Sequence, residues 1–194
     1  FQTLEFRQLQ HAVSHKTDLS EKEYRPILTK AALSKLVARL QTASVFALDT
    51  ETTSPIPMKA RLVGLSFAVQ ANEAFYIPLG HDYIGAPPQL SMTEVLNQLR
   101  PILADPTIKK IGQNIKYDWI VLTRHGVELD GVVFDTMIAS YLLNPSKRAH
   151  NLDQIAMDFL GHKTIPYQEV AGKGKNALSF NQVLLDKAVP YACE

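Results

Sequence analysis

Two acidic residues stand at the end of an apolar segment, where a buried strand is expected. In Val45-Phe46-Ala47-Leu48-Asp49-Thr50-Glu51, the residues Asp49 and Glu51 are two positions apart. Because side chains alternate along a strand, both carboxylates project from the same face. Burying two neighbouring acids is costly unless a cation lies between them, and their oxygen atoms suit Mg²⁺ or Mn²⁺. The pair therefore indicates a metal site, with a solvated turn at the strand end as the alternative.

A third acid, Asp118, lies in a segment with helical apolar spacing. Its neighbours three and four positions away include Ile115, Val121 and Leu122, which places Asp118 on or beside the apolar face of a helix. A carboxylate near the start of a helix is also stabilised by the helix dipole. The pattern leaves a functional and a purely structural interpretation open.

The segments that position these acids read as strands followed by strand-helix units. Strands are expected at Val45–Asp49, Leu62–Val69, Ala74–Pro78, Ile108–Ile111 and Val132–Phe134. Helices are expected around 33–40, at 91–104, 114–125, 136–143 and 152–160, and from Ser179 to the end. Capping boxes begin at Ser91 and Ser179, and Asp135 should cap the helix that follows it. This order indicates an α/β fold, with a mixed central β-sheet flanked by helices.

Composition is that of a globular protein. The 194 residues are 46% hydrophobic and 20% charged, which suits one domain at residues 24–194 after a linker or N-terminal arm at residues 1–23. The chain has no apolar run of about 20 residues and no secretory pattern at its start, so no membrane partner is expected. The single cysteine, Cys193, excludes intramolecular disulfides and fits a reducing compartment, the cytoplasm.

The net charge taken alone argues against a DNA partner. Lys and Arg number 20 against 19 Asp and Glu, a balance of +1. A carboxylate cluster would offset basic phosphate contacts in this sum, so the charge balance leaves the question open. The segment Gly172-Lys173-Gly174-Lys175 is either a phosphate contact or a flexible surface loop. The phosphate-loop, serine-elbow and His-Glu-x-x-His zinc motifs do not occur, and the six histidines show no ligand spacing.

Three motifs in this order resemble a known family. They are Phe46-Ala47-Leu48-Asp49-Thr50-Glu51-Thr52, Gly112-Gln113-Asn114-Ile115-Lys116-Tyr117-Asp118 and Tyr191-Ala192-Cys193-Glu194. Connecting segments agree as well, among them Leu62–Phe67, His81-Asp82-Tyr83 and Phe134–Met137. From about Tyr24 to Glu194 the chain resembles the 3′→5′ proofreading exonuclease domain of bacterial DNA polymerase I. This domain is a DEDD exonuclease with a tyrosine in its third motif.

The resemblance implies an RNase H-like fold and hydrolysis of the 3′-terminal phosphodiester of single-stranded or frayed DNA. Two divalent metal ions would act, Mg²⁺ or Mn²⁺, with Zn²⁺ as a further possibility. By this resemblance Asp49 would bridge both ions, Glu51 would bind the ion that activates water, and Asp118 would help to hold the other. Tyr191 would orient the attacking water by its hydroxyl.

The resemblance also implies contacts to the terminal nucleotides and a larger parent protein. Thr52, Gln113, Asn114 and Tyr167 would bind the DNA 3′ end, Tyr167 by stacking on a base. The alternatives are a helix N-cap for Gln113 and Asn114 and a surface aromatic for Tyr167. The expected partner is a polymerase domain of the same chain, in a monomeric protein. A stand-alone exonuclease acting on RNA, similar to RNase D, and a catalytically inactive scaffold are the alternative functions.

Two positions depart from the family pattern. The third motif has an Asp four positions after its tyrosine, one position beyond Glu194, the last residue given. This fragment is therefore expected to bind one ion weakly and to cleave slowly, unless Glu194 or the terminal carboxylate substitutes. Pro55 stands where the family often has a leucine that separates the last two bases, so fraying of the 3′ end is expected to differ.

Overall fold

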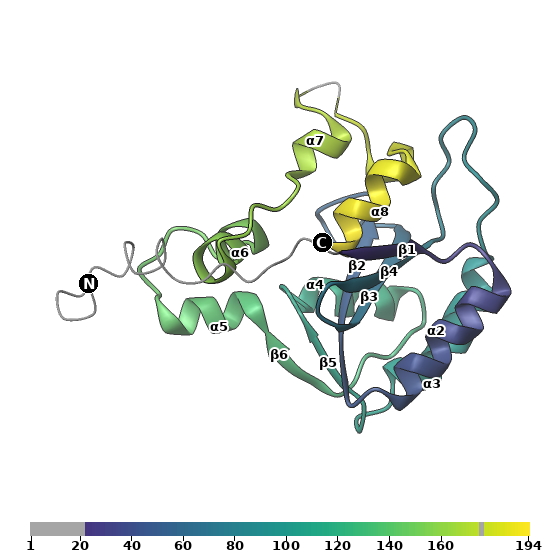
Figure 1. Ribbon diagram of the computed structural model, residues 1–194, viewed down its shortest axis with the longest axis horizontal. Coiled ribbons are helices and arrows are strands. Elements are labelled where there is room, and N and C mark those ends of the chain that lie inside the picture. The colour runs from purple at the N-terminus through teal and green to yellow at the C-terminus, as the bar shows by residue number, and fades with distance from the viewer. Residues whose placement is uncertain (1–21, 175–176) are drawn as a thin grey trace.

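The computed structural model describes residues 22–174 and 177–194, so most of the expected N-terminal arm, and Lys175 of the glycine-lysine segment, lie outside the described residues. A six-stranded sheet forms the centre of the molecule (Figure 1). Its strands are β1 (Glu23–Pro26), β2 (Val45–Thr52), β3 (Leu62–Gln70), β4 (Glu73–Pro78), β5 (Lys109–Gly112) and β6 (Val132–Asp135). Their spatial order is β1-β4-β3-β2-β5-β6.

The sheet is mixed, as the sequence predicts. Strands β2, β3 and β4 form an antiparallel meander, joined between β3 and β4 by a tight turn with Asn72 in the left-handed region (φ 65°). Strands β5 and β6 continue the sheet in parallel with β2, and β1 pairs in parallel with β4. Strand β2 is therefore near the middle of the sheet, hydrogen-bonded on both sides, where its side chains are held most firmly.

Helices cover both faces of the sheet. They are α2 (Lys30–Thr42), α3 (Met92–Leu103), α4 (Lys116–Arg124), α5 (Thr136–Leu143), α6 (Leu152–Leu160), α7 (Tyr167–Ala171), the 3₁₀ turn η3 (Phe180–Gln182) and α8 (Leu185–Cys193). The larger core contains apolar residues of α2, α3 and α4 packed on β2, β3 and β4. A second core joins α7, η3 and α8 to β3 and β4. Figure 1 shows α2 and α3 together on one side and α8 on another.

The helix expected at 91–104 begins after Ser91, its N-cap residue, as predicted, but the two expected capping boxes are wrong. Neither Ser91 nor Ser179 makes a side-chain capping hydrogen bond. The helix expected from Ser179 onward is instead η3 and α8, separated by Val183 and Leu184 in extended conformation. The cause is a long-range contact, because the carbonyl of Val183 bonds the side chain of His81 rather than continuing a helix. The expected strands are confirmed, whereas α7 was not foreseen.

Much apolar surface remains exposed on the helices beside β6. Ile138, Tyr141, Leu142 and Leu143 of α5 and Leu152, Phe159 and Leu160 of α6 are all exposed.

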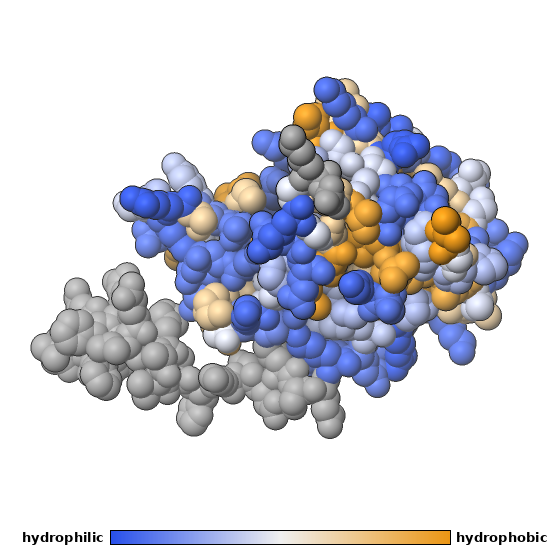
Figure 2. Space-filling view, turned by 90° about the horizontal axis from the view of Figure 1, so that it is seen from above, coloured by the Kyte–Doolittle hydropathy of each residue, from blue (hydrophilic) through white to orange (hydrophobic). Residues whose placement is uncertain are grey.

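Seen from above, the molecule shows a mainly hydrophilic surface with a hydrophobic area near the middle (Figure 2). Within the described residues, no helix has the length and apolar character needed to cross a membrane.

Asp135 caps α5, as its position predicts, and it also accepts backbone hydrogen bonds from the residues just before α4. Its carboxylate accepts hydrogen bonds from the backbone N–H groups of Met137 (2.8 Å) and Ile138 (3.2 Å) at the start of α5. It also accepts from Asn114 (3.1 Å) and Ile115 (2.8 Å), just before α4. The free N–H groups of both helix starts are thus satisfied by one side chain.

We predict that Asp135→Ala lowers the free energy of unfolding by about 2 kcal/mol, because it leaves these N–H groups without an acceptor. Urea unfolding followed by circular dichroism measures the change. The matched control is Ser91→Ala, which should change stability by less than about 0.5 kcal/mol since Ser91 makes no side-chain capping bond. Equal effects of the two substitutions would contradict the role of Asp135.

Candidate active site

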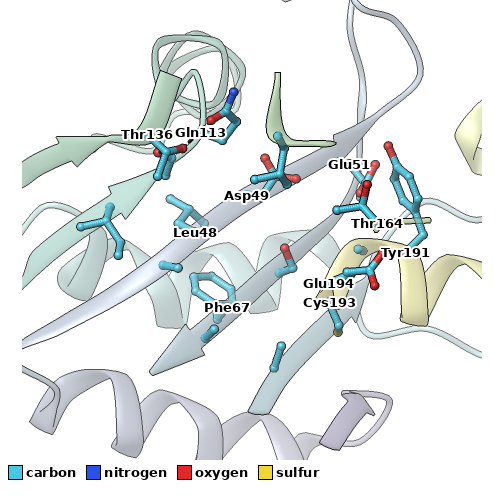
Figure 3. Close-up of a pocket in the computed structure, with 18 of the residues that line it drawn as sticks. Leu48, Asp49, Glu51, Phe67, Gln113, Thr136, Thr164, Tyr191, Cys193 and Glu194 are labelled. Carbon is cyan, nitrogen blue, oxygen red and sulfur yellow. Dashed lines mark hydrogen bonds between the residues drawn. The ribbon is translucent and has the colours of Figure 1, made fainter. Parts of the chain in front are cut away.

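Strand β2 directs Asp49 and Glu51 into one open pocket of about 400 Å³. The pocket is also lined by Gln113 beside β5, by Thr164 after α6 and by Tyr191 of α8. Figure 3 shows Glu51, Thr164 and Tyr191 near one another, with Asp49 on the side of Gln113. The spacing of two along β2 therefore places both carboxylates on one face, as the sequence predicts.

A glycine beside Glu51 makes room for the ring of Tyr76. Asp49 lies opposite Ser66 in the register of β2 and β3, and Glu51 lies opposite Gly64. A Cβ atom at Gly64 would lie 2.1 Å from the hydroxyl oxygen of Tyr76, whose ring occupies that space. The strand next to Glu51 must therefore have glycine here, since any larger residue would displace the buried Tyr76.

The electrostatics of the two acids are unfavourable without a cation. Asp49 is accessible within the pocket but surrounded by protein, and this desolvation raises its pKa to about 6. Burial and repulsion by Asp49 and Asp118 raise the pKa of Glu51 well above its usual range. Elsewhere the chain neutralises a buried acid, since Glu73 pairs with Arg39 (2.6 Å) and has a lowered pKa through that hydrogen bond.

Asp118 lies next to this pair and is bonded to Thr50, the residue between the two acids. It is buried, as its position beside the apolar stripe predicts, and its Oδ1 accepts hydrogen bonds from the backbone N–H of Thr50 (2.9 Å) and its hydroxyl (2.5 Å). Burial and the charge of Asp49 raise the pKa of Asp118 well above its usual range. Asp118 does not line the pocket.

The donor chemistry of these acids fits a divalent cation. Across residues 22–174 and 177–194, none of the three carboxylates forms an ion pair with a basic side chain. Hard oxygen donors with uncompensated negative charge are the ligands that Mg²⁺ and Mn²⁺ prefer. In the same described part of the chain, however, no three acidic, histidine or cysteine side chains form a ready-made ligand set. Asp49 and Glu51 are the donors that already share the pocket.

Tyr191 is held by an aromatic cluster. Its ring lies 5.7 Å from that of buried Phe180 and 5.9 Å from that of Tyr167, while Tyr167 stacks on Phe180 at 6.4 Å, measured between centroids. Burial, followed by the charges of Glu51 and Asp49, raises the pKa of Tyr191 well above its usual range. The hydroxyl is therefore neutral near pH 7 and can donate a hydrogen bond toward the acids.

Of the remaining predicted residues, Gln113 lines the pocket, whereas Thr52, Asn114 and Tyr167 do not. Gln113 donates from Nε2 to the carbonyl of His150 (2.8 Å) and accepts from the Thr136 hydroxyl. Asn114 has a positive φ of 54°, which turns the chain from β5 toward α4. Neither side chain caps α4, so the alternative of an N-cap is wrong for both. Thr52 lies behind the pocket, with its hydroxyl bonded to that of Tyr117.

Glu194 is occupied by other contacts. Its carboxylate accepts from Lys22 (3.0 Å) and from the backbone N–H of Ile165, and it bonds His162 Nε2 at 2.8 Å. These bonds lower the pKa of Glu194 although burial opposes them. Glu194 also lines the pocket, but in this arrangement its carboxylate oxygens are bonded to Lys22, His162 and Ile165 and connect α8 to the segment after α6.

Three residues of the site were missed from the sequence. Phe180 supports Tyr191, Ser66 lies opposite Asp49, and Asp153 lines the pocket and bonds the hydroxyl of Thr164 (2.7 Å). Ser66 carried a signal, being a polar residue in the otherwise apolar Leu62–Phe67. Phe180 and Asp153 carried none, because their roles depend on contacts with distant segments.

Comparison with known proteins identifies the family to which the sequence is similar. Residues 24–194 match the family described as 3′-5′ exonuclease. DNA polymerase I of Pseudomonas aeruginosa is 42% identical over 177 residues, which are 90% of this chain and 19% of that protein. DNA polymerase I of Rhizobium leguminosarum is 38% identical over 188 residues, 88% of this chain and 18% of that protein. The chain thus spans about a fifth of the length of these curated relatives.

Solved structures establish the fold. Trypanosoma brucei RNase D superposes with a TM-score of 0.64 at 17% identity, covering 88% of this chain and 60% of that one. Brucella melitensis NrnC superposes with a TM-score of 0.60 at 21% identity, covering 88% and 72%. These similarities confirm the RNase H-like fold that the sequence predicts. Together with the family match, they show that this chain belongs to the 3′-5′ exonuclease family and aligns with the corresponding segment of bacterial DNA polymerase I.

Proposed function

We propose that this chain is a metal-dependent 3′→5′ exonuclease that hydrolyses the terminal phosphodiester of single-stranded or frayed DNA. One observation supports this most strongly. Asp49 and Glu51 from β2 and Tyr191 from α8 meet in one open pocket, within a chain of the exonuclease family. Their predicted catalytic roles are thus consistent with their positions.

The acids provide the cation site. Asp49 and Glu51 would hold divalent ions at the pocket, and Asp118, whose charge interacts with both, would help to hold one of them. When bound, such ions lower the pKa of water and stabilise a leaving oxygen. The neutral hydroxyl of Tyr191 would donate a hydrogen bond that orients the attacking water, since its raised pKa excludes a role as a base near pH 7.

The DNA 3′ end would lie between the pocket and α7. Tyr167 rests one ring face on Phe180 and is 42% exposed, so the ring can stack on a base. Gln113 is bonded to His150 and Thr136, so we propose that it fixes the loop on which Asn114 and its backbone approach the nucleotide. Thr52, bonded to Tyr117, would contact the nucleotide next to Glu51.

RNA is the second candidate substrate. The fold similarity to RNase D favours it, and one of those structures is described as a complex with RNA U12. The sequence similarity is to DNA polymerase I, however, and this favours DNA. An inactive scaffold is disfavoured by the three retained, uncompensated acids.

We propose that a polymerase domain of the same parent chain is the main partner, because the curated relatives are about five times as long as this chain. The protein would act as a monomer on DNA in the cytoplasm of a bacterium. The exposed apolar residues of α5 and α6 are compatible with a neighbouring domain.

We predict Mn²⁺-dependent shortening of 5′-labelled single-stranded DNA from its 3′ end, at a rate above that for RNA of the same sequence. Asp49→Asn should lower the rate by about 100-fold or more, because it removes a cation ligand at the reaction centre. Denaturing gel electrophoresis of timed samples gives the rates.

Glu128→Gln is the matched control, since it removes one negative charge from an exposed position outside the pocket, and its rate should stay within about twofold of the parent chain. Chelation should abolish cleavage by the parent chain. If Asp49→Asn cleaves as fast as Glu128→Gln, the site assignment is wrong. Faster cleavage of RNA would favour the RNase D-like alternative.

We further predict that Asp49→Asn stabilises the metal-free chain at high pH. The pKa of Asp49 is raised to about 6 in the fold, above about 3.9 in an unfolded chain. With respect to Asp49 alone, the fold is therefore most stable below pH 4, where Asp49 is protonated in both the folded and the unfolded chain. It loses stability as the pH rises through 6 and Asp49 becomes charged in the fold. Allowing for solvent screening in the open pocket, the variant should gain about 1 kcal/mol at pH 8, or about 3 °C in Tm.

Thermal unfolding at pH 4, 6 and 8, with chelator or with Mn²⁺, tests this. The advantage of Asp49→Asn should vanish at pH 4 and should reverse in Mn²⁺, which stabilises the parent chain by binding its folded state. A difference in Tm that is the same at all three pH values would show that the charge of Asp49 is not responsible.

A further inference from the structure

A short segment outside the pocket lining holds the start of α8. His81, Asp82 and Tyr83 follow β4 and bond the residues that connect η3 to α8. The backbone N–H of Asp82 donates to the carbonyl of Asn181 (2.9 Å). In return, the side chains of Asn181 (Nδ2, 2.8 Å) and Gln182 (Nε2) both donate to Asp82 Oδ1. One carboxylate oxygen thus fixes two successive residues just before α8.

Helix α8 needs such support because it is intrinsically weak. It has nine residues, and its N-cap residue, Leu184, has no side-chain oxygen to accept a backbone N–H. Pro190 within the helix lacks an N–H group and cannot bond the carbonyl four residues earlier. A helix this short is not stable by itself in water, so tertiary contacts determine where it lies.

Tyr83 supplies the missing cap. Its hydroxyl oxygen accepts a hydrogen bond from the backbone N–H of Leu185, the first residue of α8, at 3.3 Å. A free N–H at the start of a helix is normally satisfied by the N-cap side chain. Here the acceptor comes from a residue 102 positions earlier in the chain.

His81 connects this contact to the sheet. Its Nδ1 donates to the carbonyl of Val183 (3.0 Å), and its Nε2 accepts from the hydroxyl of Tyr76 (2.8 Å). These roles follow because a carbonyl can only accept. Tyr76 belongs to β4 and fills the space beside Gly64, the cross-strand neighbour of Glu51. The start of α8 is therefore tied to the same part of the sheet that carries the acids.

We propose that Asp82 and Tyr83 are positioning residues, which hold α8 so that the hydroxyl of Tyr191 points at Glu51 and Asp49. This inference rests on the proposed nuclease function. Asp82 and Tyr83 do not line the pocket, so they act on the reaction only through α8. Since catalysis depends on the placement of a hydroxyl to within about 1 Å, loosening the helix lowers kcat with little change in KM.

The experiment uses the 194-residue chain with Mn²⁺ and 5′-labelled single-stranded DNA. Asp82→Ala, which removes the acceptor, should lower kcat by about 10-fold with KM within about twofold. Asp82→Asn keeps an acceptor oxygen and should restore kcat to within about twofold of the parent chain. In a Tyr191→Phe background, Asp82→Ala should lower kcat by less than about twofold further, because the hydroxyl it positions is already absent.

Hydrogen exchange measured by mass spectrometry gives a readout that does not need activity. In Asp82→Ala, and to a smaller extent in Tyr83→Phe, amides of residues 185–194 should exchange about fivefold faster, with other segments unchanged. The control is Asp105→Ala, which also removes a surface carboxylate with two hydrogen bonds, to the N–H (2.8 Å) and hydroxyl (2.6 Å) of Thr107, outside the pocket. It should alter neither the exchange of 185–194 nor kcat.

Several results would overturn the proposal. Unchanged exchange of residues 185–194 in Asp82→Ala would show that this segment does not hold α8, and faster exchange throughout the chain would show general destabilisation instead. A full 10-fold loss in the Tyr191→Phe background would show that Asp82 does not act through that hydroxyl. If the parent chain cleaves neither DNA nor RNA, the proposed function fails, and the exchange result alone then decides whether α8 is held in this way.

Discussion

Uncompensated negative charge is the constraint on which the rest of this structure depends. Desolvation raises the pKa of all three acids, Asp49, Glu51 and Asp118, and the charge of Asp49 raises the pKa of the other two further. Glu73, another buried acid, is neutralised by an ion pair with Arg39, but no such ion pair forms at Asp49, Glu51 or Asp118 in the described part of the chain. Charge that is left unpaired at a cost to stability is typical of sites that bind a cation.

The sheet has small residues opposite both acids. Gly64 lies opposite Glu51 and Ser66 lies opposite Asp49, and both carboxylates line the open pocket. The space at Gly64 is taken by Tyr76, which is fixed by His81. Apolar packing of β2 is confined to its other face, where Phe46 and Leu48 join the larger core.

Local patterns were enough to predict most of the fold and part of the site. The period of two in β2 places Asp49 and Glu51 together, and helical spacing places Asp118 at a buried position. Local patterns could not predict the hydrogen bonds between segments that are distant in the sequence. These bonds explain why Asp135 caps two helices, why Gln113 bonds His150 instead of capping α4, and why Glu194 bonds Lys22 and the segment after α6. In each case the partner lies 20 or more residues away, where spacing carries no information.

The same distinction separates the two halves of the active site. The acids stand on a central strand, which pairs with β3 at Asp49 and Glu51 and with β5 at its first residues, so the sheet itself holds them. Tyr191 stands on a short, proline-containing helix whose position depends on a few long-range bonds and on the rings of Phe180 and Tyr167. In the proposed mechanism the two parts have different tasks, because the acids must resist mutual repulsion while they hold a cation, whereas the hydroxyl must only be oriented. Because α8 depends on long-range bonds, we expect its placement to respond to substitutions outside the pocket.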